Sequence, residues 1–572
     1  MRRRAQARRL RIQHIQTGTF YNRPIVVRVL LGPVRRFFPL AILFAALTVK
    51  PVAQAQVAPA GGADARQTGG RLVLVLPFDN RSGQANLGWI GDSFPYTLDQ
   101  RLISAGFLTI SRDDRQYALD HLGLPPGFRP SRATTIRIAQ TLDADYVIVG
   151  SFNVQDGRIT VQAQVLEVNA LRMSAPLEDS SELTRLFDVE NAIAWKIAQR
   201  MDPHFAVAEQ TFLAAAGGVR LSSFEDYIRG TSAATADERL KRLKAAVAET
   251  PGYSAALLAL GKEQYAAREY DDAAATLAKI EPTDRVALEA GYYLGLTRFN
   301  SAKYAEAASA FAFVATRLPL PEVVNNQGVA ASRQGKDATP LFEQVVAADP
   351  NDADYHFNLA VALLGRSDIA GATREVQTAL KLHAADPEAT GLLARLQATH
   401  GAVSVLKATV SADGFDPTTR IRRTWSEAQF RQAAFELDQM RAMRMAALPP
   451  AEQAVQYSQL GQEYLAQGLI PEAEQEFQTA LSADAKSAAA HAGIAMVREH
   501  SGDAEAARAE AVSSVQLAPN VAAYLVLARL DLQAGQLTAS VADVTAALRL
   551  EPKNSAALGM KTALAARGQV VQ

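Results

Sequence analysis

The side chains that could support catalysis or metal binding are scattered along the chain rather than grouped in motifs. The eight His residues show no His-Glu-x-x-His spacing, and His491 and His500 are nine residues apart, too far for one ligand face of a helix. The sequence has no phosphate-binding loop, dinucleotide-binding glycine pattern or Gly-x-Ser-x-Gly elbow. Acidic pairs such as Asp113-Asp114 are typical of solvated helix starts. We therefore predict no catalytic residue, no cofactor and no metal site.

The charge and cysteine content narrow the classes of partner. The 572 residues include no Cys, which excludes disulfides, thiolate metal sites and a lipid anchor attached through Cys. Residues 1–55 carry eleven basic and no acidic side chains; without them, 48 basic side chains face 59 acidic ones, a net charge of −11. A mildly acidic protein lacks the basic surface that nucleic acid requires, so we expect no nucleic-acid partner.

The N-terminus is typical of an export signal. An apolar run at 37–49 follows two Arg residues, and Ala53-Gln54-Ala55 forms a small-x-small cleavage pattern. This order predicts a signal peptide within 1–55 and then a flexible linker at 56–70. The run is shorter than the roughly 20 apolar residues of a membrane span, so an uncleaved inner-membrane anchor is the disfavoured alternative. We expect an exported protein, either periplasmic or associated with the outer membrane.

The long Arg-rich lead before the signal has two interpretations. Residues 1–33 are either an over-extended translation start, with synthesis beginning near Val34, or a basic arm with a role of its own. We favour the first interpretation, because the ordinary signal elements begin only at Arg35.

The second half of the chain is periodic. A small residue inside a helix-forming stretch recurs at intervals of 32 to 34 residues in two series, and most of these positions are followed by an Ala twelve residues later and an apolar residue four residues after that. Two helices of about 12–14 residues with short turns occupy about 34 residues. The small residues mark the points where the paired helices cross: Gly261, Gly295, Gly328 and Ala360, then Gly461, Ala495 and Ala528.

Segments such as YLGLTRFNSAKYAEAASAFAFVATRLP (293–319) and LGQEYLAQGLIPEAEQEFQTALSADA (460–485) resemble tetratricopeptide repeats. The resemblance implies a mostly α-helical superhelix with a concave groove lined by first-helix side chains. Asn326 and Asn358 match the Asn-x-small position that this family often uses. We expect the groove to bind an extended or helical peptide through Lys262, Tyr265, Tyr292, Phe299, Asn325, Asn326, Arg333, Phe357 and Asn358.

Two features of the groove stay open at this stage. Lys262, Asn325 and Arg333 do not reproduce in register the repeated pattern by which the family clamps a C-terminal carboxylate, so such a ligand is in doubt. The Tyr and Phe residues could equally pack between hairpins without touching a ligand.

A small α/β domain precedes the repeats. Alternating apolar residues, turn signals and helix caps predict the order β-α-β-α-β-β-α, with a further short strand near Arg172. The first helix is expected to begin at Asp92 as its cap and another at Ser131, with a hairpin turn at 155–157. The loop 79–83 is either a ligand site or a plain turn, and we favour the turn because it lacks a phosphate-binding glycine pattern.

The stretches VLVLPFDN, GDSFPYTLDQRL, ATTIRIAQTLDADYVIVGSF and GRITVQAQVLEV resemble the TolB amino-terminal-domain-like family, which is related to FlgO-type domains. The resemblance covers residues 71–203. It implies an exported, envelope-associated interaction domain with no catalytic residues to carry over.

We therefore predict an α+β multidomain protein in which a small α/β domain precedes a tetratricopeptide α-solenoid. Its expected function is that of an exported, non-catalytic scaffold or adaptor for protein–protein interactions in the bacterial cell envelope. The alternative is a ligand- or glycan-binding protein that acts through the α/β domain, with the repeats as a spacer. The oligomeric state is left open. The predicted boundaries are 71–203 for the α/β domain, 204–222 for a connector, 223–402 for the first repeat block, 403–450 for a diverged helical spacer that is either an insertion with a role or decayed repeats, and 451–572 for the second repeat block with its closing helix.

Overall fold

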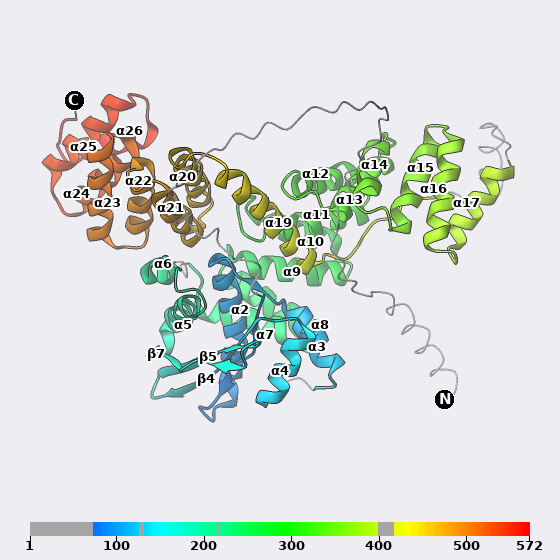
Figure 1. Ribbon diagram of the computed structural model, residues 1–572, viewed down its shortest axis with the longest axis horizontal. Helices are drawn as coiled ribbons and strands as arrows, with labels where there is room; N and C mark the ends of the chain where they lie inside the picture. Colours follow the sequence, from blue (N-terminus) through cyan, green and yellow to red (C-terminus); the bar gives the residue numbers. More distant parts are fainter. Residues whose placement is uncertain (1–71, 125–130, 215–217, 399–416, 572) are drawn as a thin grey trace, which may run out of the picture. The chain divides into compact units, whose positions relative to one another are not determined.

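The computed structural model describes residues 72–124, 131–214, 218–398 and 417–571 (Figure 1). The signal peptide, the linker and part of the spacer predicted from the sequence lie outside these residues. The described chain consists of an α/β region followed by two series of helical hairpins.

The α/β region is built on one mixed sheet. Its strands follow the order β3-β1-β4-β5-β6; β1 is parallel to β3 and β4, whereas β4 and β5 form an antiparallel hairpin. Asp156 and Gly157 in the turn of this hairpin both have positive φ, as the predicted turn requires. The strands are β1 (Leu72–Val75), β2 (Asp79–Asn80), β3 (Leu108–Thr109), β4 (Tyr146–Gln155), β5 (Arg158–Glu167), β6 (Arg172–Met173) and β7 (Leu177–Glu182).

Helices cover both faces of this sheet because apolar side chains alternate along β1. Val73 and Val75 pack with α2 and α5, whereas Leu74 and Leu76 pack on the side of α3 and α4. The helices of the region are α2 (Gly88–Ser104), α3 (Arg112–His121), α4 (Arg132–Thr141), α5 (Leu186–Met201) and the short α6 (Glu209–Ala214).

Three details of this region differ from the sequence prediction. Helix α2 begins at Gly88, so Asp92 lies inside the helix and is not its cap. Helix α3 and the edge strand β7 were not predicted; the burial pattern of β7 alternates without a fully buried residue, so its sequence carries little apolar signal. The prediction for α4 is confirmed, because the Ser131 side chain accepts a hydrogen bond from the Thr134 amide.

The loop at 79–83 forms a turn held by its own side chains. The Asn80 side-chain oxygen accepts hydrogen bonds from the Ser82 amide and hydroxyl, at 2.9 and 2.6 Å. Gly83 has a φ of +72°, a conformation that glycine adopts without strain.

The remaining helices form antiparallel pairs, which confirms the predicted helical-repeat fold class (Figure 1). The first block comprises α7 (Leu221–Ser232), α8 (Ala236–Glu249), α9 (Ser254–Ala266), α10 (Tyr270–Leu277), α11 (Ala287–Asn300), α12 (Tyr304–Ala315), α13 (Pro321–Arg333), α14 (Thr339–Ala348), α15 (Ala353–Gly365), α16 (Ile369–Leu382) and α17 (Pro387–Ala398). The second comprises α20 (Pro450–Ala466), α21 (Ile470–Ala483), α22 (Ala488–His500), α23 (Ala504–Leu517), α24 (Val521–Gln533), α25 (Leu537–Leu550) and α26 (Ser555–Ala565).

The periodic small residues lie where the paired helices cross, as their spacing predicted. A Cβ added at Gly295 would lie 2.6 Å from the Phe311 ring, and one at Gly461 would lie 2.7 Å from the Phe477 ring. Both rings are fully buried. A larger first-helix residue would push the hairpin apart, so the glycines set the distance between the helices.

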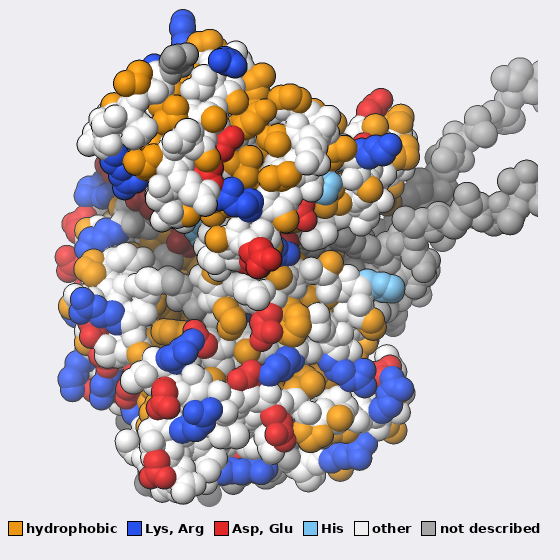
Figure 2. All heavy atoms as spheres, turned by 90° about the vertical axis from the view of Figure 1, so that its left-hand side faces the viewer, with side chains coloured by type: hydrophobic (Ala, Val, Ile, Leu, Met, Phe, Trp, Pro, Cys, Tyr) orange, Lys and Arg blue, Asp and Glu red, His pale blue; other side chains and the backbone are white. Residues whose placement is uncertain are grey.

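Two elements lie between the blocks. Residues 417–426 have no helix or strand, and α19 (Glu427–Ala446) follows them. The side chains of Ile421, Trp425 and Phe430 pack against the apolar core of the first block. At the other end of the array, Leu517, Leu550 and Leu558 are exposed, and Figure 2 shows hydrophobic side chains on the surface of the second block.

Candidate peptide groove

An extended segment of the chain itself, residues 417–425, lies against the first helices of the first block. At Arg420 the backbone makes a pair of hydrogen bonds with one amide side chain: the Asn358 Nδ2 group donates to the Arg420 carbonyl at 2.8 Å, and the Arg420 amide donates back to Asn358 Oδ1 at 2.6 Å. Asn326 makes the same pair with Arg422, at 2.7 and 2.8 Å. Two equivalent Asn residues therefore hold two alternate residues of one extended segment.

The repeat architecture produces this match. Asn326 and Asn358 each stand two residues before a crossing-point small residue, so their helices present them at the same level. Alternate residues of an extended chain have their backbone groups on the same side. Amides on successive first helices can therefore bind residues two apart, and because α15 holds Arg420 and α13 holds Arg422, the segment runs opposite to the order of the helices.

Two further side chains complete the grip on the backbone. Asn325 donates to the Arg420 carbonyl at 3.0 Å and accepts from Asn358 at 2.7 Å. The Tyr292 hydroxyl donates to the Arg422 and Thr424 carbonyls at 2.8 and 3.1 Å. The three Asn side chains are fully buried, so without these partners each would leave polar groups unpaired at a cost of about 1–3 kcal/mol.

Four carboxylates surround the two Arg side chains of the segment. Arg420 pairs with Asp354, Asp386 and Glu388 at 2.8, 2.6 and 3.0 Å. Arg422 pairs with Asp352 and, at 3.1 Å, with Asp354, which bridges both guanidinium groups. Burial alone would raise the pKa of Asp386, but the hydrogen bond and charge of Arg420 hold that pKa below its usual value.

Aromatic rings of the first block pack against the two guanidinium groups. The Arg420 guanidinium lies 3.7 Å from the centre of the Phe357 ring, and that of Arg422 lies 5.0 Å from the Tyr355 ring. A cation over an aromatic face is attracted by the ring quadrupole, and Arg stacks well there. The groove therefore combines backbone recognition with two sites for a cationic side chain.

The other predicted groove residues divide into two groups. Tyr292 contacts the segment as described, and its ring lies 5.1 Å from that of Trp425. Lys262 instead pairs with Glu289 at 2.7 Å, and Tyr265 packs against Tyr270 and Tyr293. Burial would lower the pKa of Lys262, but Glu289 outweighs it and raises that pKa above its ordinary value. Burial raises the pKa of the Tyr265 hydroxyl, and the charge of Arg423 in the segment opposes that rise, so Tyr265 also faces the segment.

Phe299 packs in the same apolar clusters as Ile421 of the segment, whereas Arg333 lies at the end of its helix. Phe299 is partly buried and packs against Tyr304, with ring centres 5.3 Å apart. Arg333 is exposed at the end of α13. Within the described residues, no hydrogen bond or ion pair joins either side chain to 417–425.

Sequence reasoning missed the four carboxylates and the segment. Asp352 and Asp386 accept hydrogen bonds from the backbone amides that open α15 and α17, so they resemble ordinary helix caps. Their spacing carried a signal, because Asp352 and Asp354 recur 34 residues later as Asp386 and Glu388, one repeat away. Nothing in the local sequence shows that residues 417–425 return to helices that precede them by 60 to 130 residues.

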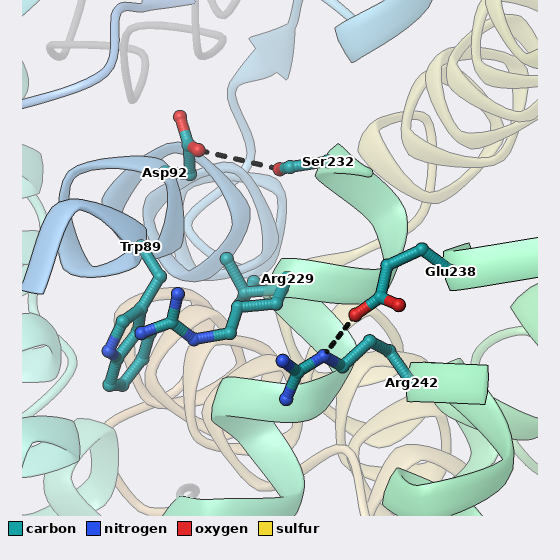
Figure 3. Close-up of a pocket in the computed structure, with 7 residues that line it drawn as sticks. Trp89, Asp92, Arg229, Ser232, Glu238 and Arg242 are labelled. Carbon is teal, nitrogen blue, oxygen red and sulfur yellow. Dashed lines mark hydrogen bonds and ion pairs between the residues drawn. The ribbon is translucent and has the colours of Figure 1, made fainter. Parts of the chain in front are cut away.

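The α/β region forms one side of a separate polar pocket of about 250 Å³ (Figure 3). Trp89 and Asp92 of α2 face Arg229 and Ser232 of α7, and Asp92 accepts a hydrogen bond from Ser232 at 3.4 Å. The Trp89 indole N–H is buried without a hydrogen-bond partner among the described residues. This pocket is the part of the structure that bears on the alternative of a ligand site in the α/β region.

No group of three or more His, Asp or Glu side chains among the described residues is arranged to hold a metal ion. Among the helices described, none is both long and apolar enough to cross a bilayer.

Comparison with family models identifies the helical array. A model described as tetratricopeptide repeat matches residues 330–396, and a second model with the same description matches 458–522. Both blocks contain tetratricopeptide repeats. The predicted repeat resemblance is thereby confirmed, whereas the TolB-like resemblance of residues 71–203 stays a prediction. No curated protein matches the chain.

The solved structures that resemble parts of the chain are distant. The LpoB C-terminal domain from Escherichia coli is 23% identical, with 20% of this chain and 83% of that chain covered and a TM-score of 0.18. YrrB, described as a tetratricopeptide protein with an unusual peptide-binding site, is 15% identical, with coverages of 36% and 98% and a TM-score of 0.24. The complex of the yeast Sti1 TPR2AB domain with pHSP90 is 14% identical, with coverages of 50% and 99% and a TM-score of 0.19.

Proposed function

We propose that this protein is an exported, non-catalytic scaffold of the bacterial cell envelope that binds an extended segment of a partner protein in the groove of its first repeat block. The observation that carries the proposal is the paired hydrogen bonding of Asn326 and Asn358 to alternate residues of an extended chain. Such bonds recognise backbone rather than side chains, so they suit any extended peptide. Tetratricopeptide repeats stack into arrays with extended binding surfaces, which supports the same function.

The envelope location rests on the predicted signal peptide in residues 1–55. Cell fractionation combined with N-terminal sequencing of the mature protein tests it. Recovery outside the cytoplasm, with a new N-terminus near Gln56, supports export; cytoplasmic recovery of the intact N-terminus contradicts it.

The binding function is tested by photo-crosslinking in the full chain. A photoreactive amino acid replaces Arg333, exposed at the end of the groove helix α13, and in a matched variant it replaces Tyr117, exposed on α3 of the α/β region. We expect protein adducts from position 333 in envelope extract and none from position 117. Adducts from position 117 alone would favour the alternative in which the α/β region binds the ligand.

A further inference from the structure

The contacts of residues 417–425 are of two separable kinds. The backbone contacts come from Tyr292 and the three Asn side chains, and any extended chain could make them. The contacts that depend on sequence come mainly from Arg420 and Arg422, which enter the acidic cluster formed by Asp352, Asp354, Asp386 and Glu388. The segment thus shows which sequence the groove accepts: two basic side chains two positions apart.

The segment is held by side chains of the first block, through hydrogen bonds, ion pairs and the packing of Ile421 and Trp425 against the apolar core. No backbone–backbone hydrogen bond joins residues 417–425 to another described part of the chain. The side chains of Arg420 and Arg422 are 21% and 30% exposed, and Arg423 and Thr424 are exposed. A second extended chain with the same spacing of basic residues could therefore replace the backbone hydrogen bonds and the ion pairs of Arg420 and Arg422.

The charge balance favours such a replacement. Four carboxylates share two guanidinium groups, so the site stays acidic even when the segment is bound. If the segment left the groove, the four carboxylates would remain in partly buried positions without a positively charged partner, and like charges there repel strongly. The groove is therefore expected to exchange one basic occupant for another and not to stand empty.

We propose, building on the function proposed above, that residues 417–425 are an internal competitor that occupies the groove until an extended segment of another protein, carrying two basic residues two positions apart, displaces it. The competitor is tethered to the groove it fills. A tethered ligand acts at an effective concentration on the order of millimolar, so a partner must bind more tightly or be locally concentrated to displace it. The competitor sets a threshold that restricts the groove to strongly basic segments.

The test uses the full-length exported protein and a fluorescent nonapeptide with the sequence of residues 417–425, Pro-Thr-Thr-Arg-Ile-Arg-Arg-Thr-Trp. Titrations by fluorescence anisotropy compare the wild-type protein with the double variant Arg420→Ala/Arg422→Ala. Weakening the internal competitor should tighten binding of the added peptide at least tenfold, because the fraction of open groove rises. A peptide with Ala at both positions that correspond to Arg420 and Arg422 should not bind.

Two matched variants locate the binding. Arg423→Ala removes a charge from the same segment but outside the acidic cluster, and it should change the peptide affinity less than threefold. Adding Asn326→Ala and Asn358→Ala to the double variant should abolish the gain, because the backbone grip is lost. An unchanged affinity in this quadruple variant would overturn the assignment of the groove.

A second measurement uses the wild-type protein, so that the proposal can be tested even if the double variant does not fold. Amide hydrogen exchange of residues 417–425 is followed in the wild-type protein with and without saturating unlabelled nonapeptide. Displacement predicts at least tenfold faster exchange in this segment when the peptide is present. Unchanged exchange at saturation would show that the segment is a permanent part of the block and would overturn the proposal.

Two outcomes separate this proposal from the function on which it rests. Photo-crosslinks to a partner from position 333, without any effect of Arg420→Ala/Arg422→Ala on peptide affinity, would leave the scaffold function standing and remove the competitor. A dimer in light scattering that Arg420→Ala/Arg422→Ala dissociates would show that a second copy supplies the segment, which overturns displacement by another protein.

Discussion

The two repeat blocks share a hairpin design but differ at the positions that bind peptide. In the first block His356 joins Glu375 at 2.6 Å and the Pro350 carbonyl at 3.0 Å; in the second His491 joins Glu510 at 2.6 Å and the Ala485 carbonyl at 3.2 Å. The same His therefore ties the same hairpin in both blocks. Two residues before the crossing-point small residue, however, the first block has Asn326 and Asn358 where the second has Gly493 and Val526.

The difference teaches that packing decides where an array can carry an amide. A Cβ at Gly493 would lie 2.2 Å from the Phe477 ring, so any larger residue at this position requires that ring to shift. The second block has another use for its polar residues: Glu474 is buried and accepts hydrogen bonds from Ala208, Thr211 and Arg498. One block binds an extended chain, and the other holds the α6 segment that follows the α/β region.

The largest effect is expected from breaking the polar contact of the second block. Glu474→Ala leaves the Arg498 guanidinium, which is 12% exposed, without its carboxylate, at a cost of about 3 kcal/mol. The variant should unfold at a lower temperature, and amide exchange in residues 209–214 should become faster. Glu505→Ala, exposed on α23, is the control and should change neither. Unchanged exchange at 209–214 would mean that Glu474 does not hold α6.

The packing explanation is tested by one substitution at two glycines of the second block. Gly493→Ala should destabilise the block by about 1–3 kcal/mol, because its Cβ overlaps Phe477. Gly559→Ala, on a helix with open space around the Cβ, should stabilise it by up to about 1 kcal/mol. Melting curves of both variants measure whether each substitution lowers or raises the stability. Equal effects of the two substitutions would show that the Phe477 ring does not restrict the side chain at position 493.

The grip of the first block is tested by proteolysis. Trypsin cleaves after Arg, and Asn326→Ala/Asn358→Ala removes four hydrogen bonds that hold Arg420 and Arg422. Cleavage within 420–423 should become about tenfold faster, in line with the loss of roughly 1–2 kcal/mol of binding to the groove. Gln462→Ala, exposed on the second block, should leave the rate unchanged.

The smallest effect is a difference in pH dependence between the blocks. Burial and, next, the charge of Asp531 raise the pKa of Asp543 in the second block to about 6. The folded block therefore binds more protons than the unfolded chain between about pH 4 and 6, and its stability falls as pH rises through this window, by on the order of 1 kcal/mol for a half-exposed group. Asp543→Asn should remove this slope in melting curves.

Asp386 of the first block changes stability with pH in the opposite direction. Its pKa is lowered, so its contribution is fully present above the ordinary Asp value and is lost as pH falls below it. Tryptic cleavage cannot report this in acid, but the protection of the amides of residues 417–425, taken relative to their intrinsic exchange rate at each pH, should fall only at the acid end. A fall in this protection between pH 4 and 6 would contradict the assigned pairing with Arg420.

The sequence alone determined the repeats and the hairpin crossings. Spacing of 32 to 34 residues requires small residues where helices cross, and Gly261, Gly295 and Gly461 meet large apolar side chains there. The repeat interval also singled out Asn326 and Asn358, because residues one repeat apart occupy equivalent places on successive helices. Local rules suffice for such features, since helix propensity, capping and packing within a hairpin act over a few tens of residues.

Only the tertiary structure decided what these residues face. The return of residues 417–425 to helices up to 130 residues earlier depends on contacts without local signal: Asp352 and Asp386 look like helix caps until Arg420 and Arg422 approach them. Likewise, only the structure shows that Lys262 pairs with Glu289. Ion pairs and side-chain hydrogen bonds between distant segments depend on how the whole chain folds. The repeat pattern determines only which helix surfaces are available for these contacts.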